Sequence, residues 1–276
     1  GWGTAKELNL RGAKVYMLCR SRDRTEKARG EMIQAGCDGS RLIYVNLDLG
    51  SIESVRKCAE EMHKLESHVD ILVNNAGISA GAYERTADGH ESTWQTNHLG
   101  PFLLTELLLQ LVEKSEAGRI INVTGGIYTI ISSLDLSTID EKEGFGGSVV
   151  AYSRSKLANV MHARELNRRL RARDNDVITV NSLRPGVIHT ELGRDHPWLS
   201  WTTHYLFWFI QKTRLDGAQT TLYAALSGEV KGVSGKYFTV KLCCMSLLHI
   251  LVTSPGWKAT STSIVNLPEF LYISAM

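Results

Sequence analysis

The sequence lacks several features that mark common classes of protein. No stretch approaches the roughly 18 to 20 uninterrupted apolar residues that a membrane-spanning helix needs, and the longer apolar runs cover only 198–210 and 242–252. Either run is too short to cross a bilayer, although it could lie on a membrane surface. No internal repeat and no low-complexity linker divides the chain. We therefore expect one main domain without a membrane-spanning segment.

The sequence also lacks a cluster of cysteines and a large net charge. The five cysteines form no CxxC pair and no cluster with histidine at metal-ligand spacing, and their odd number argues against a complete disulfide framework. The formal net charge is only +2 at pH 7, so the chain lacks the strongly basic character of nucleic-acid-binding proteins. We expect no bound metal, no nucleic-acid partner and a reducing compartment.

What the sequence does contain is an alternation of short apolar segments with longer amphipathic ones. Its 276 residues are enough for one large α/β domain. Strands are expected at 13–20, 41–49, 69–74, 119–123, 177–183 and 235–240, and helices at 22–34, 51–66, 92–112, 149–171 and 216–226. This alternation predicts an α/β fold with a doubly wound, parallel, Rossmann-like sheet. Ligands of such sheets bind beyond the carboxyl ends of the strands, so the residues there are the candidates for a site.

Charged residues lie at the ends of the first two predicted strands. Arg20 and Arg22 follow the first strand. An arginine there suits the 2′-phosphate of NADP(H), whereas an acidic residue would accept hydrogen bonds from a ribose 2′-hydroxyl. A solvated basic turn is the alternative. Asp48 ends the second strand, where its carboxylate could bind an adenine amino group or cap the helix that begins at Ser51.

Small and amide residues follow the third predicted strand. The turn Asn75-Ala76-Gly77 would let a ligand approach the backbone closely. Asn97 lies inside an otherwise apolar helical stretch. Because a buried amide needs hydrogen-bond partners, Asn97 is either a satisfied core residue or part of a site.

Tyr152 and Lys156 carry the most specific chemistry in the chain. Their spacing of four places them on one face at the start of a predicted helix. A phenol with a pKa near 10 is a poor acid or base at neutral pH, and a neighbouring ammonium lowers that pKa. The pair therefore suits proton transfer between an alcohol and a carbonyl. A chance occurrence of YxxxK on a helix surface is the alternative.

The fifth predicted strand leads into Arg-Pro-Gly-Val-Ile-His-Thr at 184–190. Pro185 and Gly186 impose a turn at the strand end, and Thr190 could hydrogen-bond a ligand amide. His189 has no evident partner and is interpreted as structural.

Taken in order, these motifs resemble those of the short-chain dehydrogenase/reductase family. The family-like segments are NNAG at 74–77, Asn97, YSRSK at 152–156 and RPGVIHT at 184–190. A second set of segments is similar to the retinol dehydrogenase branch: LAN at 157–159, GAQT at 217–220 and SGKYF at 234–238. The resemblance covers roughly residues 3 to 241.

The resemblance implies catalytic roles. Tyr152 would be the general acid/base, Lys156 would lower its pKa and hold the nicotinamide ribose, and Asn97 would support a proton-relay water. Hydride would pass between the nicotinamide and the substrate carbon while the protein positions both and transfers the proton.

The resemblance also implies a cofactor site for NADP(H). Arg20 would meet the 2′-phosphate, and Asp48 would meet the adenine. The cofactor would further be lined by Asn75, Ala76 and Gly77 and held at its nicotinamide end by Pro185, Gly186 and Thr190.

The bulky apolar segment 197–210 falls where the family carries its substrate lid. Such a lid suits a long hydrophobic substrate such as a retinoid or lipid aldehyde, and it could also touch a membrane. We therefore expect a hydrophobic small-molecule substrate and a location in the cytoplasm or on the cytoplasmic face of the endoplasmic reticulum. Peripheral membrane contact and a homodimer are compatible with this expectation.

The chain departs from its family in three places. Relatives begin with a strand and a Gly-rich turn, TGxxxGIG, whereas GWGTAKEL at 1–8 matches only the helix after that turn. The absent strand would be central, and its loss is expected to leave two interior sheet edges unpaired. The tail 242–276 matches nothing in the family, so the domain is expected to cover 1–241.

The third departure is Gly125, which stands where the family has a catalytic serine. Losing one such oxyanion donor typically costs about 10² to 10³ in rate. Thr124, Thr129 or Ser132 could substitute. The leading hypothesis is an NADPH-dependent retinal or lipid-aldehyde reductase, and the alternative is a catalytically impaired protein that binds cofactor or acts as a scaffold.

Overall fold

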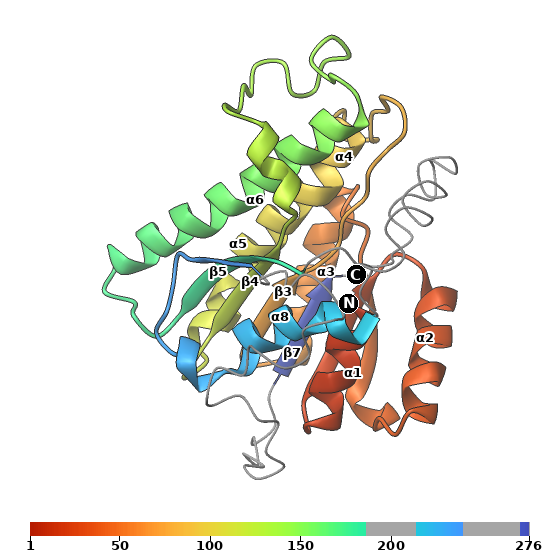
Figure 1. The fold of residues 1–276 in the computed structure, drawn as a ribbon. Helices are drawn as coiled ribbons and strands as arrows, with labels where there is room; N and C mark the ends of the chain where they lie inside the picture. Colours follow the sequence, from red (N-terminus) through yellow and green to blue (C-terminus); the bar gives the residue numbers. More distant parts are fainter. Residues whose placement is uncertain (186–213, 240–270, 276) are drawn as a thin grey trace, which may run out of the picture.

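One parallel sheet contains every strand of the described residues, which are 1–185, 214–239 and 271–275 of this computed structural model. The strands are β1 (Lys14–Cys19), β2 (Leu42–Asn46), β3 (Ile71–Asn74), β4 (Arg119–Val123), β5 (Thr179–Arg184), β6 (Tyr237–Thr239) and β7 (Leu271–Ala275). Their order across the sheet is β2-β1-β7-β3-β4-β5-β6. This confirms the predicted α/β, doubly wound, Rossmann-like fold (Figure 1).

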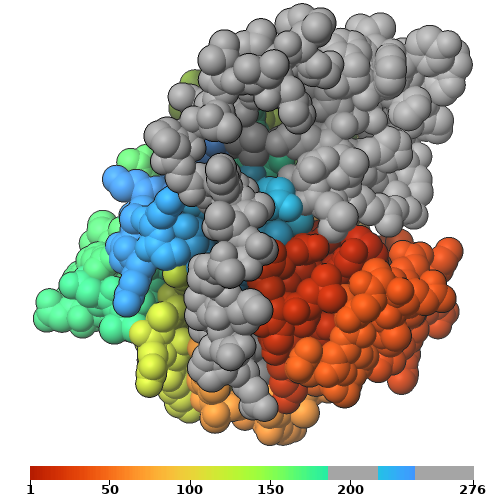
Figure 2. All heavy atoms as spheres, turned by 60° about the horizontal axis from the view of Figure 1, so that its bottom comes forward, coloured from red at the N-terminus to blue at the C-terminus, as the bar shows by residue number. Residues whose placement is uncertain are grey.

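Helices cover both faces of the sheet. One core joins α3 (Ile52–Leu65), α5 (Gly100–Glu113) and α6 (Ser148–Arg171) to one face, through residues such as Val55, Leu104 and Leu166. The other core joins α1 (Trp2–Leu10), α2 (Arg22–Gln34) and α8 (Arg214–Leu226) to the opposite face. Figure 2 shows α1 and α2, in red and orange, side by side on this second face.

Alternating side chains of β1 explain why both faces need a cover. Tyr16 and Leu18 are buried in the first core, whereas Val15 and Met17 are buried in the second. Successive side chains of a strand point to opposite faces, so an apolar run of this kind belongs inside a sheet and not at its edge.

Serine caps start the two helices that follow β1 and β2. The Ser21 side chain accepts from the amide of Arg24 at the start of α2, and the Ser51 side chain accepts from Ser54 at the start of α3. The helix predicted at 22–34 and the cap predicted at Ser51 are both confirmed. No helix within the described part of the chain is long and apolar enough to cross a membrane.

The centre of the sheet differs from the expectation. β7 lies between β1 and β3 and pairs in parallel with both, with Tyr272 opposite Val15 on one side and Ile71 on the other. The interior edges of β1 and β3 are therefore paired, and the expectation that they would be left open is wrong. The sheet also extends beyond the predicted boundary at 241, because a parallel strand needs only the right register and a long enough connection.

Candidate active site

The candidate site lies where the strand order changes direction across the sheet. From β7, successive strands run outward through β1 to β2 and, in the other direction, through β3 to β4 and β5. Ligands of doubly wound sheets bind at such a switch point, beyond the carboxyl ends of the strands. The helix α1 runs back to the amino end of β1, so its first turn lies at the same edge as the predicted cofactor residues.

Tyr152 and Lys156 lie together on the first turns of α6, facing the loops that follow β3 and β4. Nζ of Lys156 is 5.4 Å from the centroid of the Tyr152 ring and donates to the carbonyl of Val123 at 3.3 Å. Lys156 is only 3% exposed and has no acidic partner among the described residues. The predicted pairing of the two side chains is thus present in the structure.

Burial dominates the electrostatics of both groups. It raises the pKa of Tyr152 to about 12 and lowers the pKa of Lys156 to about 8. The neighbouring ammonium was expected to lower the phenol pKa, but the pKa is raised because the desolvation of a buried phenolate outweighs that attraction. Near neutral pH the phenol is protonated.

Asn97 is a fully satisfied amide at a break in the helix. The predicted helix 92–112 divides into α4 (Ser92–Trp94), a π-helical segment (Gln95–Leu99) and α5. In the π segment, Nδ2 of Asn97 donates to the carbonyl of Ile78 and to Oγ of Ser155, at 2.8 and 3.0 Å, and Oδ1 accepts from the Ile78 amide. Asn97 therefore fastens the loop after β3 to α6, close to Tyr152. π-Helical turns are frequent at functional sites.

Asn159 is a further residue of the site that was not predicted from the sequence. Its Nδ2 donates to the backbone carbonyl of Asn97 at 2.8 Å, and its Oδ1 lies 3.0 Å from Nδ1 of His98. The signal was available, because Asn159 follows Lys156 by three residues and so shares its helix face. Asn159 links α6 to the π segment.

Gly77 lies where a side chain would collide with Lys156. A Cβ atom there would be 3.0 Å from Nζ of Lys156 and 3.6 Å from Oδ1 of Asn97. The turn Asn75-Ala76-Gly77 thus brings the backbone close to the amine of Lys156.

The remaining cofactor candidates are more dispersed. Arg20 is exposed just beyond β1, and Asp48 closes a turn by accepting from the amide of Gly50 at 2.9 Å. The cap of α3 is left to Ser51, so Asp48 does not cap it. Pro185 follows β5 and is partly buried, whereas Gly186, His189, Thr190 and the predicted lid at 197–210 lie outside the described residues.

Gly125 lies directly against the phenol. A Cβ atom on Gly125 would be 3.6 Å from Oη of Tyr152. The hydroxyls considered as substitutes are engaged elsewhere: Oγ1 of Thr124 donates to the Leu183 carbonyl, and Oγ1 of Thr129 donates to the Gly126 carbonyl. The third candidate, Ser132, is exposed.

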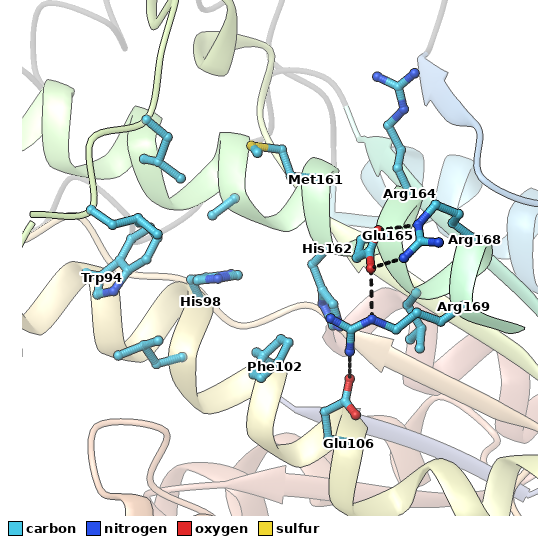
Figure 3. Close-up of a pocket in the computed structure, with 15 residues that line it drawn as sticks. Trp94, His98, Phe102, Glu106, Met161, His162, Arg164, Glu165, Arg168 and Arg169 are labelled. Carbon is cyan, nitrogen blue, oxygen red and sulfur yellow. Dashed lines mark hydrogen bonds and ion pairs between the residues drawn. The ribbon is translucent and has the colours of Figure 1, made fainter.

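A separate groove of about 830 Å³ lies between α5 and α6 (Figure 3). Trp94, His98 and Phe102 line one wall, and Met161 and His162 line the other. Neither Tyr152 nor Lys156 lines this groove, because residues such as Met161 occupy another side of α6. The groove is therefore distinct from the candidate active site.

Comparison with known proteins identifies the family. The model of the family described as short chain dehydrogenase matches residues 1–197. The chain belongs to the short-chain dehydrogenase family. It is 42% identical over 251 residues to retinol dehydrogenase 14 from Mus musculus, covering 86% of this chain and 73% of that protein. It is 40% identical over 241 residues to retinol dehydrogenase 12 from Homo sapiens, covering 87% and 73%. It is thus a retinol dehydrogenase-like member of an oxidoreductase family.

Solved structures agree on the fold. An uncharacterised protein from Mycobacterium paratuberculosis is 32% identical with a TM-score of 0.66, covering 87% of this chain and 75% of that one. A gluconate 5-dehydrogenase from Burkholderia cenocepacia, solved in complex with NADP and tartrate, has a TM-score of 0.65 at 19% identity, covering 87% and 89%. At that identity the likeness concerns the fold alone. The short-chain dehydrogenase family uses a nicotinamide cofactor.

Proposed function

We propose that this protein is an NADP(H)-dependent oxidoreductase that interconverts a hydrophobic alcohol and its aldehyde or ketone, with Tyr152 as the general acid/base. One observation carries the proposal. A protonated phenol and a buried amine face each other 5.4 Å apart, ring centroid to Nζ, beside a glycine turn at the ligand-binding edge of the sheet. Proton transfer to a carbonyl oxygen needs an acid of this kind, held away from bulk water.

The donors of Lys156 fit a nicotinamide ribose. An ammonium has three N–H donors, and the described residues accept from Lys156 at one place, the Val123 carbonyl. A buried group whose N–H donors lack acceptors costs free energy unless a ligand accepts hydrogen bonds from them. Two ribose hydroxyls would complete them, and the neighbouring Gly77 leaves room for close approach.

Arg20 supports NADP(H) over NAD(H). Its side chain is exposed at the carboxyl end of β1, the strand next to β7, where the adenosine ribose of a dinucleotide would lie. An arginine at this position matches a 2′-phosphate in charge and geometry. Arg22 lies with its guanidinium 5.9 Å from the Tyr44 ring centroid and can support the same phosphate from beside the ring.

The residues would act as follows. The bound cofactor supplies or accepts the hydride. Tyr152 donates its proton to the carbonyl oxygen in reduction and recovers it in oxidation. Lys156 in its ammonium form stabilises the phenolate that remains, because opposite charges attract strongly where water is excluded. Asn97 and Asn159 hold the loop after β3 and the π segment against α6. With a pKa of about 12, Tyr152 is protonated near neutral pH, which is the form that donates in reduction.

The names of the relatives support the proposed substrate class. The curated proteins named above are retinol dehydrogenases, and the predicted apolar lid at 197–210 suits a retinoid or a medium-chain lipid aldehyde. The test is the consumption of NADPH by the purified protein with retinal or decanal, with NADH as the control cofactor. Alcohol formation with preference for NADPH supports the proposal, and no turnover contradicts it.

Gly125 gives the alternative a specific basis. A member of the family without the serine hydroxyl could bind cofactor and not turn it over. Tight NADPH binding measured by fluorescence, together with the absence of any turnover, would favour that cofactor-binding function over the enzymatic one.

A further inference from the structure

Carbonyl reduction at this site needs a second hydrogen-bond donor. The carbonyl oxygen gains negative charge as hydride reaches the carbon, and preorganised donors aimed at that oxygen lower the barrier. Tyr152 supplies one donor. The position that would supply another is Gly125, and the nearby hydroxyls of Thr124 and Thr129 already donate to backbone carbonyls.

Arg184 reaches into this region from the carboxyl end of β5. Its guanidinium lies over Gly126, the residue directly after Gly125: a Cβ atom on Gly126 would overlap Nη1 of Arg184 and lie 2.9 Å from its Cδ. Consecutive Cα atoms are about 3.8 Å apart. The guanidinium therefore lies one residue along the chain from the glycine that contacts the Tyr152 phenol, and glycine at 126 leaves the space that it occupies.

Among the described residues, Arg184 has no partner that accounts for its position. It makes no hydrogen bond and no ion pair with any described residue, and its Nε is buried without an acceptor. Arg119, at the opposite end of the neighbouring strand β4, donates instead to the carbonyls of Ala224 and Ser227. Burying part of a cation without a hydrogen-bond acceptor costs free energy. A ligand that brings an acceptor to Arg184 would remove that cost.

We propose that Arg184 is a catalytic residue that donates to the substrate's carbonyl oxygen and replaces the donor absent at Gly125. The inference rests on the proposed function. In reduction, hydride from NADPH forms the new C–H bond while the π-electron pair of the C=O bond moves to oxygen. That oxygen accepts hydrogen bonds from the guanidinium and takes the proton of Tyr152. Arg184 keeps all of its protons, since a guanidinium is not deprotonated in proteins.

A cation aimed at the carbonyl oxygen has a second consequence. It binds a carboxylate in the same place more tightly than it binds a neutral hydroxyl, because charge-assisted hydrogen bonds are the stronger ones. The carboxylic acid that corresponds to the aldehyde substrate should therefore be a ligand of the NADPH-bound protein, held through Arg184.

The kinetic test uses Arg184→Gln, with Arg173→Gln as the matched control, because Arg173 is exposed in the turn that follows the last residue of α6, Arg171. Arg184→Gln is expected to lower kcat for decanal by about 10²-fold with unchanged NADPH affinity. Gly125→Ser should raise kcat only several-fold in the wild type but restore most of the loss in Arg184→Gln. A kcat for Arg184→Gln within twofold of the control, or an equal gain from Gly125→Ser in both backgrounds, overturns the proposal.

Gly126→Ala tests the position of the guanidinium without removing its charge. Its added methyl group displaces the guanidinium, so kcat should fall in the same direction as in Arg184→Gln while the melting temperature stays near that of the wild type. A Gly126→Ala variant that folds and keeps full activity contradicts the proposal, and this holds even if Arg184→Gln fails to fold.

A binding measurement separates this inference from the proposed function. Calorimetry measures the affinity of the NADPH-bound protein for decanoate and for decanol. Arg184→Gln should weaken decanoate binding by at least about tenfold, which corresponds to about 1.4 kcal/mol, and should leave the affinity for decanol unchanged. If the wild type turns over no aldehyde but decanoate binding depends on Arg184, the proposed function fails and the oxygen-binding role of Arg184 stands. If decanoate binds both proteins equally, Arg184 has no such role, whatever the turnover.

Discussion

A Cβ atom on Gly125 would lie 3.6 Å from the hydroxyl oxygen of Tyr152, with its other nearest neighbours at 3.7 and 3.8 Å. Those distances are ordinary contacts, and the extended backbone of Gly125, with φ −140° and ψ 147°, suits any residue. A serine would therefore fit at 125 without strain and place its hydroxyl beside the phenol.

Gly125→Ser is expected to raise kcat several-fold, because a hydroxyl at this place adds a donor to the developing oxyanion. Steady-state kinetics with decanal and saturating NADPH measures the effect. Gly125→Ala is the control, since it adds the Cβ without the hydroxyl. A serine variant no faster than the alanine variant would contradict the expectation.

Lys156 should make the cofactor-free protein more stable as the pH rises from 8 to 9. Burial lowers its folded-state pKa from 10.5 to about 8, so the unfolded chain binds more protons in this range and folding is favoured as the pH increases. Complete relief of the burial cost would amount to ~3 kcal/mol at 1.36 kcal/mol per pKa unit. Above pH 9 the thiol of Cys58, whose pKa burial raises from 9.0 to about 12, opposes the trend.

Urea unfolding at pH 7, 8 and 9 measures this slope. Lys156→Met should be more stable than the wild type at pH 7 and should lose the rise between pH 8 and 9. A methionine variant with the same pH slope as the wild type would show that another group produces it.

Arg20 should set the choice between cofactors. Arg20→Glu removes a charge-assisted contact worth about 1.5–3 kcal/mol and introduces a carboxylate that repels a 2′-phosphate. The ratio of kcat/KM for NADPH to that for NADH should fall by at least about tenfold. Arg24→Glu, an exposed substitution one turn into α2, serves as the charge-matched control. Equal effects of the two substitutions would mean that general electrostatics, and not a contact at Arg20, determines the ratio.

The central strand β7 should respond sharply to proline. Ile273 lies between Tyr16 of β1 and Leu72 of β3, so Ile273→Pro removes a donor inside the ladder and is expected to cost roughly 3 kcal/mol or more. Ile273→Val keeps the ladder and is the control. Thermal melts that give equal midpoints for the two variants would show that β7 contributes nothing to the sheet.

Local pattern was enough to predict much of the fold. The helix at 22–34 and the strand at 119–123 were predicted with the bounds that the structure has. Their signals, a polar cap and a run of apolar residues, come from residues adjacent in sequence. The central strand was missed, because five residues near the end of a tail without clear patterning carry no sign of where they will pair. Strand pairing of this kind depends on sequence-distant edges, here those of β1 and β3.

The candidate site divides in the same way. The facing of Tyr152 and Lys156 follows from helix geometry alone, and so the sequence predicts it. The direction of the Tyr152 pKa shift cannot be predicted in this way, because it depends on burial by parts of the chain that are distant in sequence. The π segment at Asn97 is likewise fixed by a bond to the distant backbone of Ile78. The position of Arg184 over Gly126 depends on the neighbouring ends of β4 and β5, which are 58 residues apart in sequence at these two positions, 126 and 184.

The most direct test of the central claim is the rate of retinal reduction by Tyr152→Phe at saturating NADPH, with Tyr128→Phe as the control phenol. If Tyr152 is the general acid, its loss should lower kcat by about 10²- to 10⁴-fold, while NADPH affinity and the melting temperature stay near those of the wild type. A Tyr152→Phe protein that reduces retinal as fast as the wild type would contradict the account.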